Sequence, residues 1–207
     1  MMSNSRSLTP DPQSSIFWEN RYQEGTARWD LGQPAPPFVT LLHSVDAPKP
    51  GRMAVLGAGN GHDALLFADR GFEVVGFDFA PSAVTQATAA AQTRGLSARF
   101  LQRDIFALEP EFTEGFDYVL EHTCFCAIDP SQRDAYVQVV SRLLRSGGEL
   151  IGLFWARPQP GGPPFGTTPE EIQQRFAPEF EVKSLIKAID SVEGRRNEEY
   201  LARFQKR

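Results

Sequence analysis

The chain has 207 residues, of which 41% are hydrophobic and 23% charged, a balance typical of one globular domain. Its formal net charge of −5 argues against a nucleic-acid binder, and no apolar run approaches the roughly 20 residues that span a bilayer. The two cysteines, Cys124 and Cys126, are too close for an ordinary disulfide and too few for a zinc site. We therefore expect a monomeric cytoplasmic protein with no metal and no nucleic-acid or membrane partner.

The first 50 residues are predicted to lie outside the main sheet. Residues 1–15 are polar and have little to bury, which predicts a flexible tail. Residues 16–50 predict a helical cap, with short helices at 16–25 and 37–45 joined by an irregular segment. Three aromatic residues of the cap, Trp18, Tyr22 and Trp29, lie within twelve positions of the sequence. They either dock the cap on the sheet or face a cationic ligand, which aromatic rings attract.

From residue 51 onward, predicted strands and helices alternate. This alternation predicts an α/β fold, a Rossmann-like, doubly wound and mainly parallel sheet of seven strands with helices on both faces. The last two strands have little helix between them, which predicts an antiparallel C-terminal hairpin. We expect one domain over residues 16–207, with its core at 51–207. The predicted strands are 52–57, 72–78, 97–104, 116–122, 149–155, 180–189 and 197–204, and the predicted helices are 62–71, 81–95, 131–148 and one that starts at 169.

A glycine loop joins the first of these strands to the helix after it. Gly57, Gly59 and Gly61 allow a tight turn and close approach of a ligand, and the following helix N-terminus offers free N–H groups. A tight turn without a ligand is the alternative. Asp78 ends the next predicted strand, where a carboxylate can accept hydrogen bonds from both ribose hydroxyls.

Asp104 ends the third predicted strand, at the same edge of the sheet as Asp78. It can accept from an exocyclic amine, with Phe79 and Ile105 on the two faces of an adenine. Either aspartate alone also fits an ordinary strand end or helix cap. Together with the glycine loop, the two carboxylates predict a nucleoside site.

The spacing of the glycines distinguishes between nucleoside cofactors. A dinucleotide site has the pattern G-x-G-x-x-G, whereas here the third glycine comes one residue earlier and Asp63 follows it. An acidic residue at this helix start is unfavourable beside a pyrophosphate and suits a cofactor with a positive centre. This predicts S-adenosylmethionine, with a nicotinamide-dependent oxidoreductase as the alternative.

Several longer stretches resemble one family. FWENRYQEGTARWDLGQPAPP, LGAGNGHD, FDYVLEHTCFCAIDP and GGPPFGTTPEEI are similar to segments of class I S-adenosylmethionine-dependent methyltransferases. More narrowly, they resemble the thiopurine S-methyltransferase family and its thiol/halide methyltransferase branch. The resemblance extends over roughly residues 16 to 205.

The resemblance implies a role for each matched residue. Trp18, Tyr22 and Trp29 are expected around the cofactor and its reacting methyl group, and Gly57 at the methionine moiety. The resemblance also implies Asp78 at the ribose and Asp104 with Ile105 at the adenine. Gly59, Gly61 and Phe79 complete the expected cofactor site.

This chain departs from the family pattern at two positions near the acceptor. His122 stands where family members carry Tyr or Arg, and Tyr22 stands where the thiol/halide branch has Trp. The resemblance implies that His122 faces the cofactor and the substrate. His122 is also a candidate general base for a thiol, because imidazole titrates near neutrality; the alternative is a hydrogen-bonded strand-end histidine. Glu121 is a candidate for the cofactor amine or a substrate cation. The remaining substrate candidates, beside Trp29 and His122, are Trp155, Phe165 and Arg195, and Arg195 also fits a solvated face.

We therefore expect an enzyme that moves the methyl group of S-adenosylmethionine to a small soft nucleophile, a thiol in the first instance. A small-molecule N-, O-, halide or chalcogen methyltransferase is one alternative. A non-catalytic module that only binds S-adenosylmethionine is another. In each case the partner is a small molecule, the product is S-adenosylhomocysteine, and no metal is required.

Overall fold

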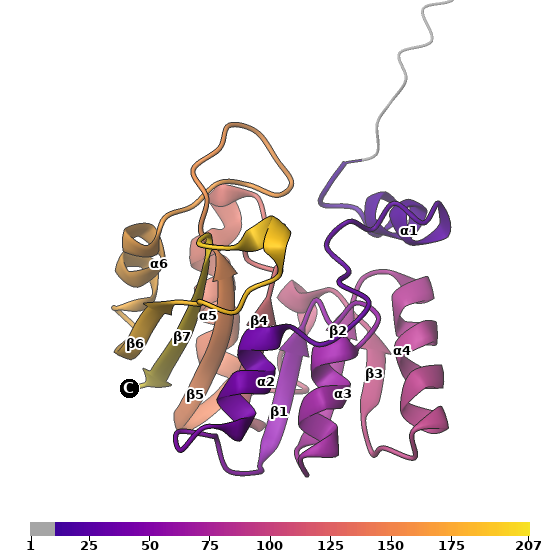
Figure 1. Ribbon diagram of the computed structural model, residues 1–207, viewed down its shortest axis with the longest axis horizontal. Helices are drawn as coiled ribbons and strands as arrows, with labels where there is room; N and C mark the ends of the chain where they lie inside the picture. Colours follow the sequence, from indigo (N-terminus) through magenta and orange to yellow (C-terminus); the bar gives the residue numbers. More distant parts are fainter. Residues whose placement is uncertain (1–10) are drawn as a thin grey trace, which may run out of the picture.

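A seven-stranded sheet forms the centre of the computed structural model, which describes residues 11–207 (Figure 1). Its strand order is β3-β2-β1-β4-β5-β7-β6. The first five strands are parallel, and β7 is inserted antiparallel between β5 and β6. The predicted fold class and C-terminal hairpin are confirmed. The strands are β1 Arg52–Leu56, β2 Glu73–Asp78, β3 Arg99–Gln102, β4 Phe116–His122, β5 Leu144–Trp155, β6 Phe180–Lys187 and β7 Glu199–Lys206.

Helices cover both faces of the sheet. Successive residues of β1 point to opposite faces, so Met53 and Val55 pack with α2, α3 and α4, whereas Ala54 and Leu56 pack with α5 and α6. Helix α1 lies apart from both layers, over the carboxyl ends of the strands (Figure 1). The helices are α1 Ser15–Gln23, α2 Pro36–His43, α3 His62–Asp69, α4 Pro81–Thr93, α5 Arg133–Leu143 and α6 Pro169–Phe176, with short 3₁₀ turns η1 Ile105–Ala107, η2 Pro130–Gln132 and η3 Glu193–Arg195.

The junction between α5 and β5 differs from the prediction. A helix was expected to continue to the Gly147–Gly148 pair, but α5 ends at Leu143 and β5 begins at once. Leu144 is fully buried and pairs with Phe116 of β4, after which the register shifts by a bulge. Burial of Leu144 in the sheet therefore ends the helix earlier than the glycines would.

The segment before α1 is placed from residue 11 onward. Ser14 is the N-cap of α1, with its hydroxyl oxygen accepting from the Ile16 amide over 3.2 Å. Pro12 accepts a hydrogen bond from the Trp18 indole over 2.8 Å. Residues 11–15, placed before the expected boundary at residue 16, thus contact the cap. The predicted tail otherwise falls on residues 1–10, which lie outside the described residues. No helix within residues 11–207 is long and apolar enough to cross a membrane.

Candidate active site

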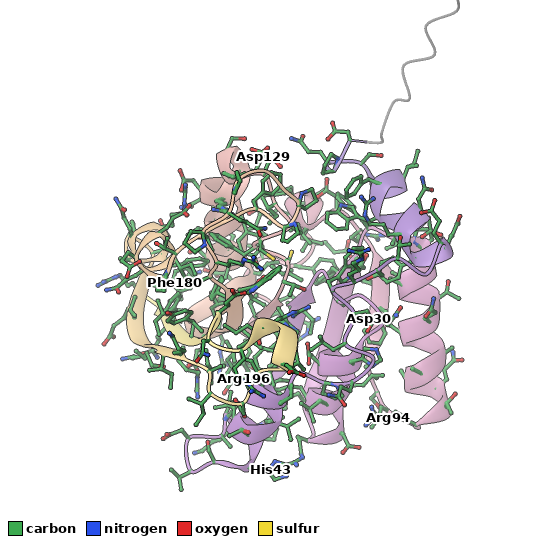
Figure 2. The ribbon with its side chains drawn as sticks, turned by 45° about the horizontal axis from the view of Figure 1, so that its top comes forward. Asp30, His43, Arg94, Asp129, Phe180 and Arg196 are labelled. Carbon is green, nitrogen blue, oxygen red and sulfur yellow. The ribbon has the colours of Figure 1, made fainter. Side chains whose placement is uncertain are left out.

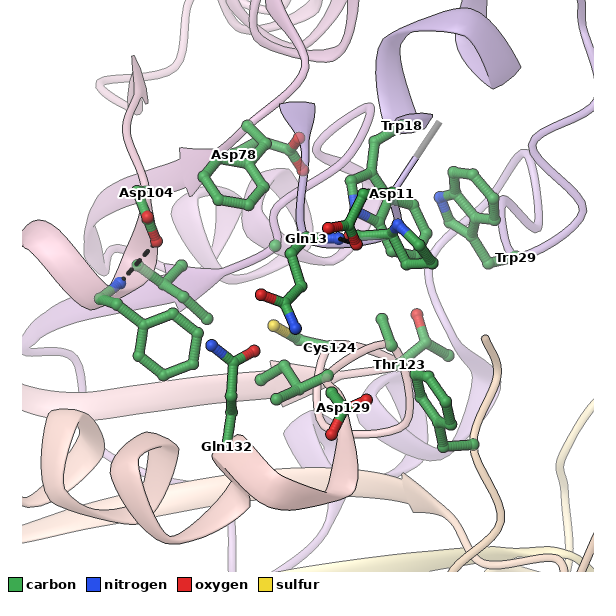
Figure 3. A pocket seen from close by; sticks show the side chains of 18 of the residues that line it. Asp11, Gln13, Trp18, Trp29, Asp78, Asp104, Thr123, Cys124, Asp129 and Gln132 are labelled. Carbon is green, nitrogen blue, oxygen red and sulfur yellow. Dashed lines mark hydrogen bonds between the residues drawn. The ribbon is translucent and has the colours of Figure 1, made fainter. Parts of the chain in front are cut away.

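A cavity of about 280 Å³ lies under α1, at the carboxyl ends of the parallel strands (Figure 3). Nine of the predicted site residues line it, and they come from the cap, the glycine loop, the ends of β2 and β3, and the loop after β5. They are Trp18, Tyr22, Trp29, Gly57, Asp78, Phe79, Asp104, Ile105 and Phe165. Gly59, Gly61, Glu121, His122, Trp155 and Arg195 were also predicted but are not among the lining residues.

The glycine loop has the conformation that its sequence requires. Gly57, Gly59 and Gly61 all have positive φ, at 62°, 53° and 81°, where a side chain is strained. Space is also limiting at Gly61, because a Cβ there would lie 2.9 Å from the Ala87 Cβ and 3.0 Å from the Phe100 ring. Gly57 therefore faces the cavity, while Gly61 lets the loop pack against α4 and β3.

The Asp78 carboxylate is buried at the end of β2. It accepts hydrogen bonds from the amides of Gly59 and Ala80, each over 2.8 Å. Burial raises the pKa of Asp78, although the two amide bonds oppose the shift. Each carboxylate oxygen keeps a second lone pair, so Asp78 can still accept from ligand hydroxyls in the cavity.

Asp104 lies at the opposite side of the cavity from the cap (Figure 3). One of its oxygens accepts from the Phe106 amide over 2.8 Å and so caps η1. Phe79 and Ile105 line the cavity with it. Two apolar side chains and a carboxylate thus line this side of the cavity.

Three aromatic rings of the cap form one contact group at the other side. Trp29 meets Trp18 and Tyr22 edge to face, with ring centroids 5.2 and 5.5 Å apart. The Trp29 indole also donates to the Tyr22 hydroxyl over 3.0 Å. Burial and the nearby Asp78 carboxylate raise the pKa of Tyr22, so its hydroxyl stays protonated. Aromatic rings beside a cavity attract a cation such as a sulfonium.

The contacts of His122 do not favour the predicted role of a general base. The ring does not line the cavity, and its Nδ1 lies 2.6 Å from Asp63. Burial favours the neutral ring, but the carboxylates of Asp63 and Glu199 outweigh it and raise the pKa of His122 to about 9. If Nε2 loses its proton, its lone pair faces Arg195 Nη1 at 2.9 Å. Neither ring nitrogen is therefore available to a substrate.

The role assigned to Asp63 changes for the same reason. We expected this acid beside the positive centre of the cofactor, but its carboxylate is engaged by His122 and by the Ala35 amide, the latter over 2.7 Å. Asp63 does not line the cavity. Its place at the helix start is thus explained by contacts within the protein.

Three other predicted residues also lie outside the cavity. Glu121 is fully buried below the turn after β4, where it accepts from the Phe125 amide and, over 2.7 Å, from the Tyr136 hydroxyl. Burial raises the pKa of Glu121 to about 7. Trp155 donates to Glu198 over 2.9 Å, and Arg195 is buried against His122 and Glu199. None of the three is among the residues that line the cavity.

Several residues that line the cavity were not predicted from the sequence. Thr123 and Cys124 follow β4 directly, so their place at the carboxyl edge of the sheet could have been predicted. Thr123 has φ of 60°, an unusual value for a β-branched residue. Gln13 and Gln132 reach the cavity from segments that carry no sequence signal (Figure 3). Cys124 lines the cavity, and burial raises the pKa of its thiol.

Within the described part of the chain, no group of three or more potential metal ligands is close enough together to hold a metal ion.

Comparisons with known proteins give a consistent result. The family model of thiopurine S-methyltransferase matches residues 13–207. Probable thiol methyltransferase 2 of Arabidopsis thaliana is 35% identical over 197 residues, which cover 93% of this chain and 86% of that protein. Thiocyanate methyltransferase 1 of Brassica oleracea is 33% identical over 196 residues, which cover 91% and 84%.

A solved structure agrees with the fold. The 1,6-didemethyltoxoflavin-N1-methyltransferase of Burkholderia thailandensis, with bound 1,6-didemethyltoxoflavin and S-adenosylhomocysteine, superposes with a TM-score of 0.74. The alignment covers 93% of this chain and 86% of that one at 20% identity, so the likeness concerns the fold alone.

The sheet with β7 antiparallel between β5 and β6, the glycine loop and the matching relatives define an S-adenosylmethionine-dependent methyltransferase. Its reaction is S-methylation. Within that class, the chain belongs to the thiopurine S-methyltransferase family.

Proposed function

We propose that the cavity under α1 binds S-adenosylmethionine and a small thiol together, and that the thiol reacts as its thiolate. The observation that carries the proposal is the convergence, on one cavity, of the glycine loop, two strand-end aspartates and three cap aromatics. These groups match the parts of the donor: hydroxyls, an adenine and a cationic sulfur. When bound, S-adenosylmethionine supplies an electrophilic methyl group on that sulfur.

Six of the lining residues bind the cofactor in this proposal. Asp78 accepts from the ribose hydroxyls, and Asp104 with Phe79 and Ile105 binds the adenine. Trp18 and Trp29 exclude water and stabilise positive charge through their ring faces, a contribution of about 0.5–2 kcal/mol per ring. Water exclusion strengthens these interactions and orients the acceptor.

The acceptor is assigned to the remaining wall of the cavity. Ile128 and Phe165 supply an apolar surface there, and Gln13 and Gln132 supply amides that can bond polar atoms of the acceptor. No histidine or lysine is among the lining residues of the described chain, and the aspartates that line the cavity are weak bases for a thiol. The acceptor is therefore expected to lose its proton to water before it reacts. The Cys124 thiol does not compete as a nucleophile, because its raised pKa keeps it protonated.

A pH series with several acceptors tests the proposal. For an aryl thiol and an aliphatic thiol, kcat/KM should rise about tenfold per pH unit up to the pKa of each free thiol, because only the thiolate reacts. Two profiles that share one pKa near neutrality would contradict the proposal, because they would reveal a base on the enzyme. Calorimetric titration with S-adenosylhomocysteine and with NADH separately tests the cofactor.

We further propose that the enzyme is a cytoplasmic monomer that needs no metal. Size-exclusion chromatography with light scattering tests the oligomeric state. Activity measured after dialysis against a chelator tests the metal requirement.

A further inference from the structure

Four ionisable side chains form a buried cluster beside the cavity. Asp63 of α3, His122 at the end of β4, Arg195 of η3 and Glu199 of β7 contact one another in series. His122 lies 2.6 Å from Asp63 and 2.9 Å from Arg195, and Arg195 lies 3.2 Å from Glu199. The side chains of His122, Arg195 and Glu199 are 11%, 8% and 2% exposed.

The charges of this cluster are balanced. Two carboxylates face one guanidinium and one imidazole that is protonated near neutral pH. Buried charges that are paired in this way hold a defined geometry, whereas removal of one partner leaves an uncompensated charge. None of the four residues lines the cavity, so a direct role in binding a ligand does not explain them.

Two members of the cluster hold the main chain of the cap. Arg195 Nη2 donates to the Trp29 carbonyl over 2.8 Å. Asp63 Oδ1 accepts from the Ala35 amide over 2.7 Å. The segment 29–35 is thus fixed at both of its ends by side chains of α3 and η3, which lie 28 and 166 residues away in the sequence.

A second set of contacts fixes the same segment from the glycine loop. Asp30, labelled in Figure 2, accepts a hydrogen bond from the Asn60 side-chain amide and lies 3.0 Å from His62 Nε2. The carbonyl of Trp29 is therefore bonded to Arg195, and the side chain of the next residue, Asp30, is bonded to Asn60 of the glycine loop. Trp29 itself lines the cavity between Trp18 and Tyr22.

We infer that Arg195 is a positioning residue that fixes Trp29 in the wall of the cavity. Its guanidinium is itself held in place by the charged cluster that it forms with Asp63, His122 and Glu199. The inference rests on the proposed function for its meaning in catalysis, but not for its test. A guanidinium suits the task because its planar fork donates in several directions at once: Nη1 to the cluster and Nη2 to the Trp29 carbonyl. A lysine keeps the charge but cannot span both partners.

The test is Arg195→Lys, with Arg203→Lys as the matched control. Arg203 lies on the same hairpin, pairs with the Glu149 carboxylate, and donates to the carbonyl of Asp46 over 2.9 Å, so it has the same kinds of partner away from the cavity. Hydrogen exchange is measured on unliganded protein, with amides of β1 and β4 as the internal reference. For Arg195→Lys, amides of 29–35 should exchange about tenfold faster relative to that reference, since a local anchor is lost.

Two further readouts separate positioning from general stability. The indole N–H resonance of Trp29, assigned with Trp29→Phe, should shift in Arg195→Lys and not in Arg203→Lys. The dissociation constant of S-adenosylhomocysteine should rise about tenfold in Arg195→Lys alone, because the wall that Trp29 forms is displaced. Unchanged relative exchange at 29–35, or equal changes in both variants, would overturn the inference. If wild-type protein bound no S-adenosylhomocysteine, the proposed function would fail, while the exchange and resonance data would still decide the role of Arg195.

Discussion

The amide of Gly59 donates a 2.8 Å hydrogen bond to the carboxylate of Asp78, so the residue that ends β2 also holds the loop that follows β1. A second amide, that of Ala80, bonds the other oxygen of the same carboxylate. Asp78 therefore shapes the glycine loop before any ligand arrives and faces the cavity at the same time.

This double contact sets the expected effect of Asp78→Ala. Loss of the acceptor should weaken S-adenosylhomocysteine binding by about 1–3 kcal/mol and lower the free energy of unfolding by a similar amount, because two buried amides lose their partner. Calorimetry and urea unfolding measure the two effects. Asp117→Ala is the control, because Asp117 accepts from the Arg52 amide over 2.6 Å at the other end of the strands. That variant should lose stability and retain affinity; equal affinity in wild type and Asp78→Ala would remove Asp78 from the ribose site.

The two parts of the cap should differ in mobility. Helix α1 is tied to α4 by Glu19, which accepts from the Ser82 amide over 3.0 Å, whereas 29–35 is anchored by the charged cluster. Hydrogen exchange in residues 15–23 should therefore slow about tenfold or more when S-adenosylhomocysteine is added, since a lid opens more readily than the core. Residues 29–35 should be protected in both states. Equal protection of α1 with and without ligand would show that it does not act as a lid.

The pKa of His122 predicts a dependence of stability on pH. The pKa is about 9 in the folded protein against an ordinary value of 6.5, so the folded state binds the proton more tightly. The resulting stabilisation is complete below about pH 6.5 and is lost as the pH rises through about 9. Urea unfolding between pH 6 and pH 10 measures it. The loss over this interval should be smaller in His122→Gln, and an identical loss in both proteins would contradict the assigned pKa.

His122→Gln also tests whether His122 acts as a general base. If His122 acts only through the cluster, turnover of an aliphatic thiol and of an acidic aryl thiol should fall by similar factors. A selective loss of about 10²-fold for the aliphatic thiol would restore the general-base hypothesis, since that is a typical effect of removing a base.

Gly61→Ala should lower the free energy of unfolding by more than the strain of a positive φ alone would cause. Gly61 and Gly95 both have positive φ, but a Cβ at Gly95 would meet nothing within 4 Å, whereas one at Gly61 would meet Ala87 and Phe100. Gly95→Ala thus measures the conformational strain, and Gly61→Ala should lose about 1–3 kcal/mol beyond it through overpacking. Thermal unfolding of both variants gives the difference; equal losses would show that the loop relaxes without cost.

The parts of the site that follow a parallel strand could be predicted from the sequence. Gly57, Asp78 and Asp104 lie where each strand ends, and the topology brings such ends to one edge of the sheet. The same reasoning placed His122 correctly in the fold, at the end of β4, but not its side chain. Its environment depends on Asp63, Arg195 and Glu199, which no local pattern connects to it.

The structure of the cap could likewise be predicted only in part from the sequence. Trp18, Tyr22 and Trp29 could be expected near the cavity from their chemistry and from the family resemblance, but the anchoring of Trp29 by a residue of the C-terminal hairpin could not. Gln13 and Gln132 were missed because a glutamine carries no periodicity or motif. The end of α5 was misplaced because tertiary burial of Leu144 outweighed two glycines that ordinarily end a helix.

The place of β7 in the sheet has a consequence for synthesis of the chain. Strand β6 leaves the ribosome before β7, yet β7 is the strand that it pairs with. Until β7 emerges, β5 has no partner on that side and the backbone groups of β6 are unpaired, so a nascent chain stopped between the two strands presents two open strand edges. Both edges close only when residues 199–206 pair with β5 and β6.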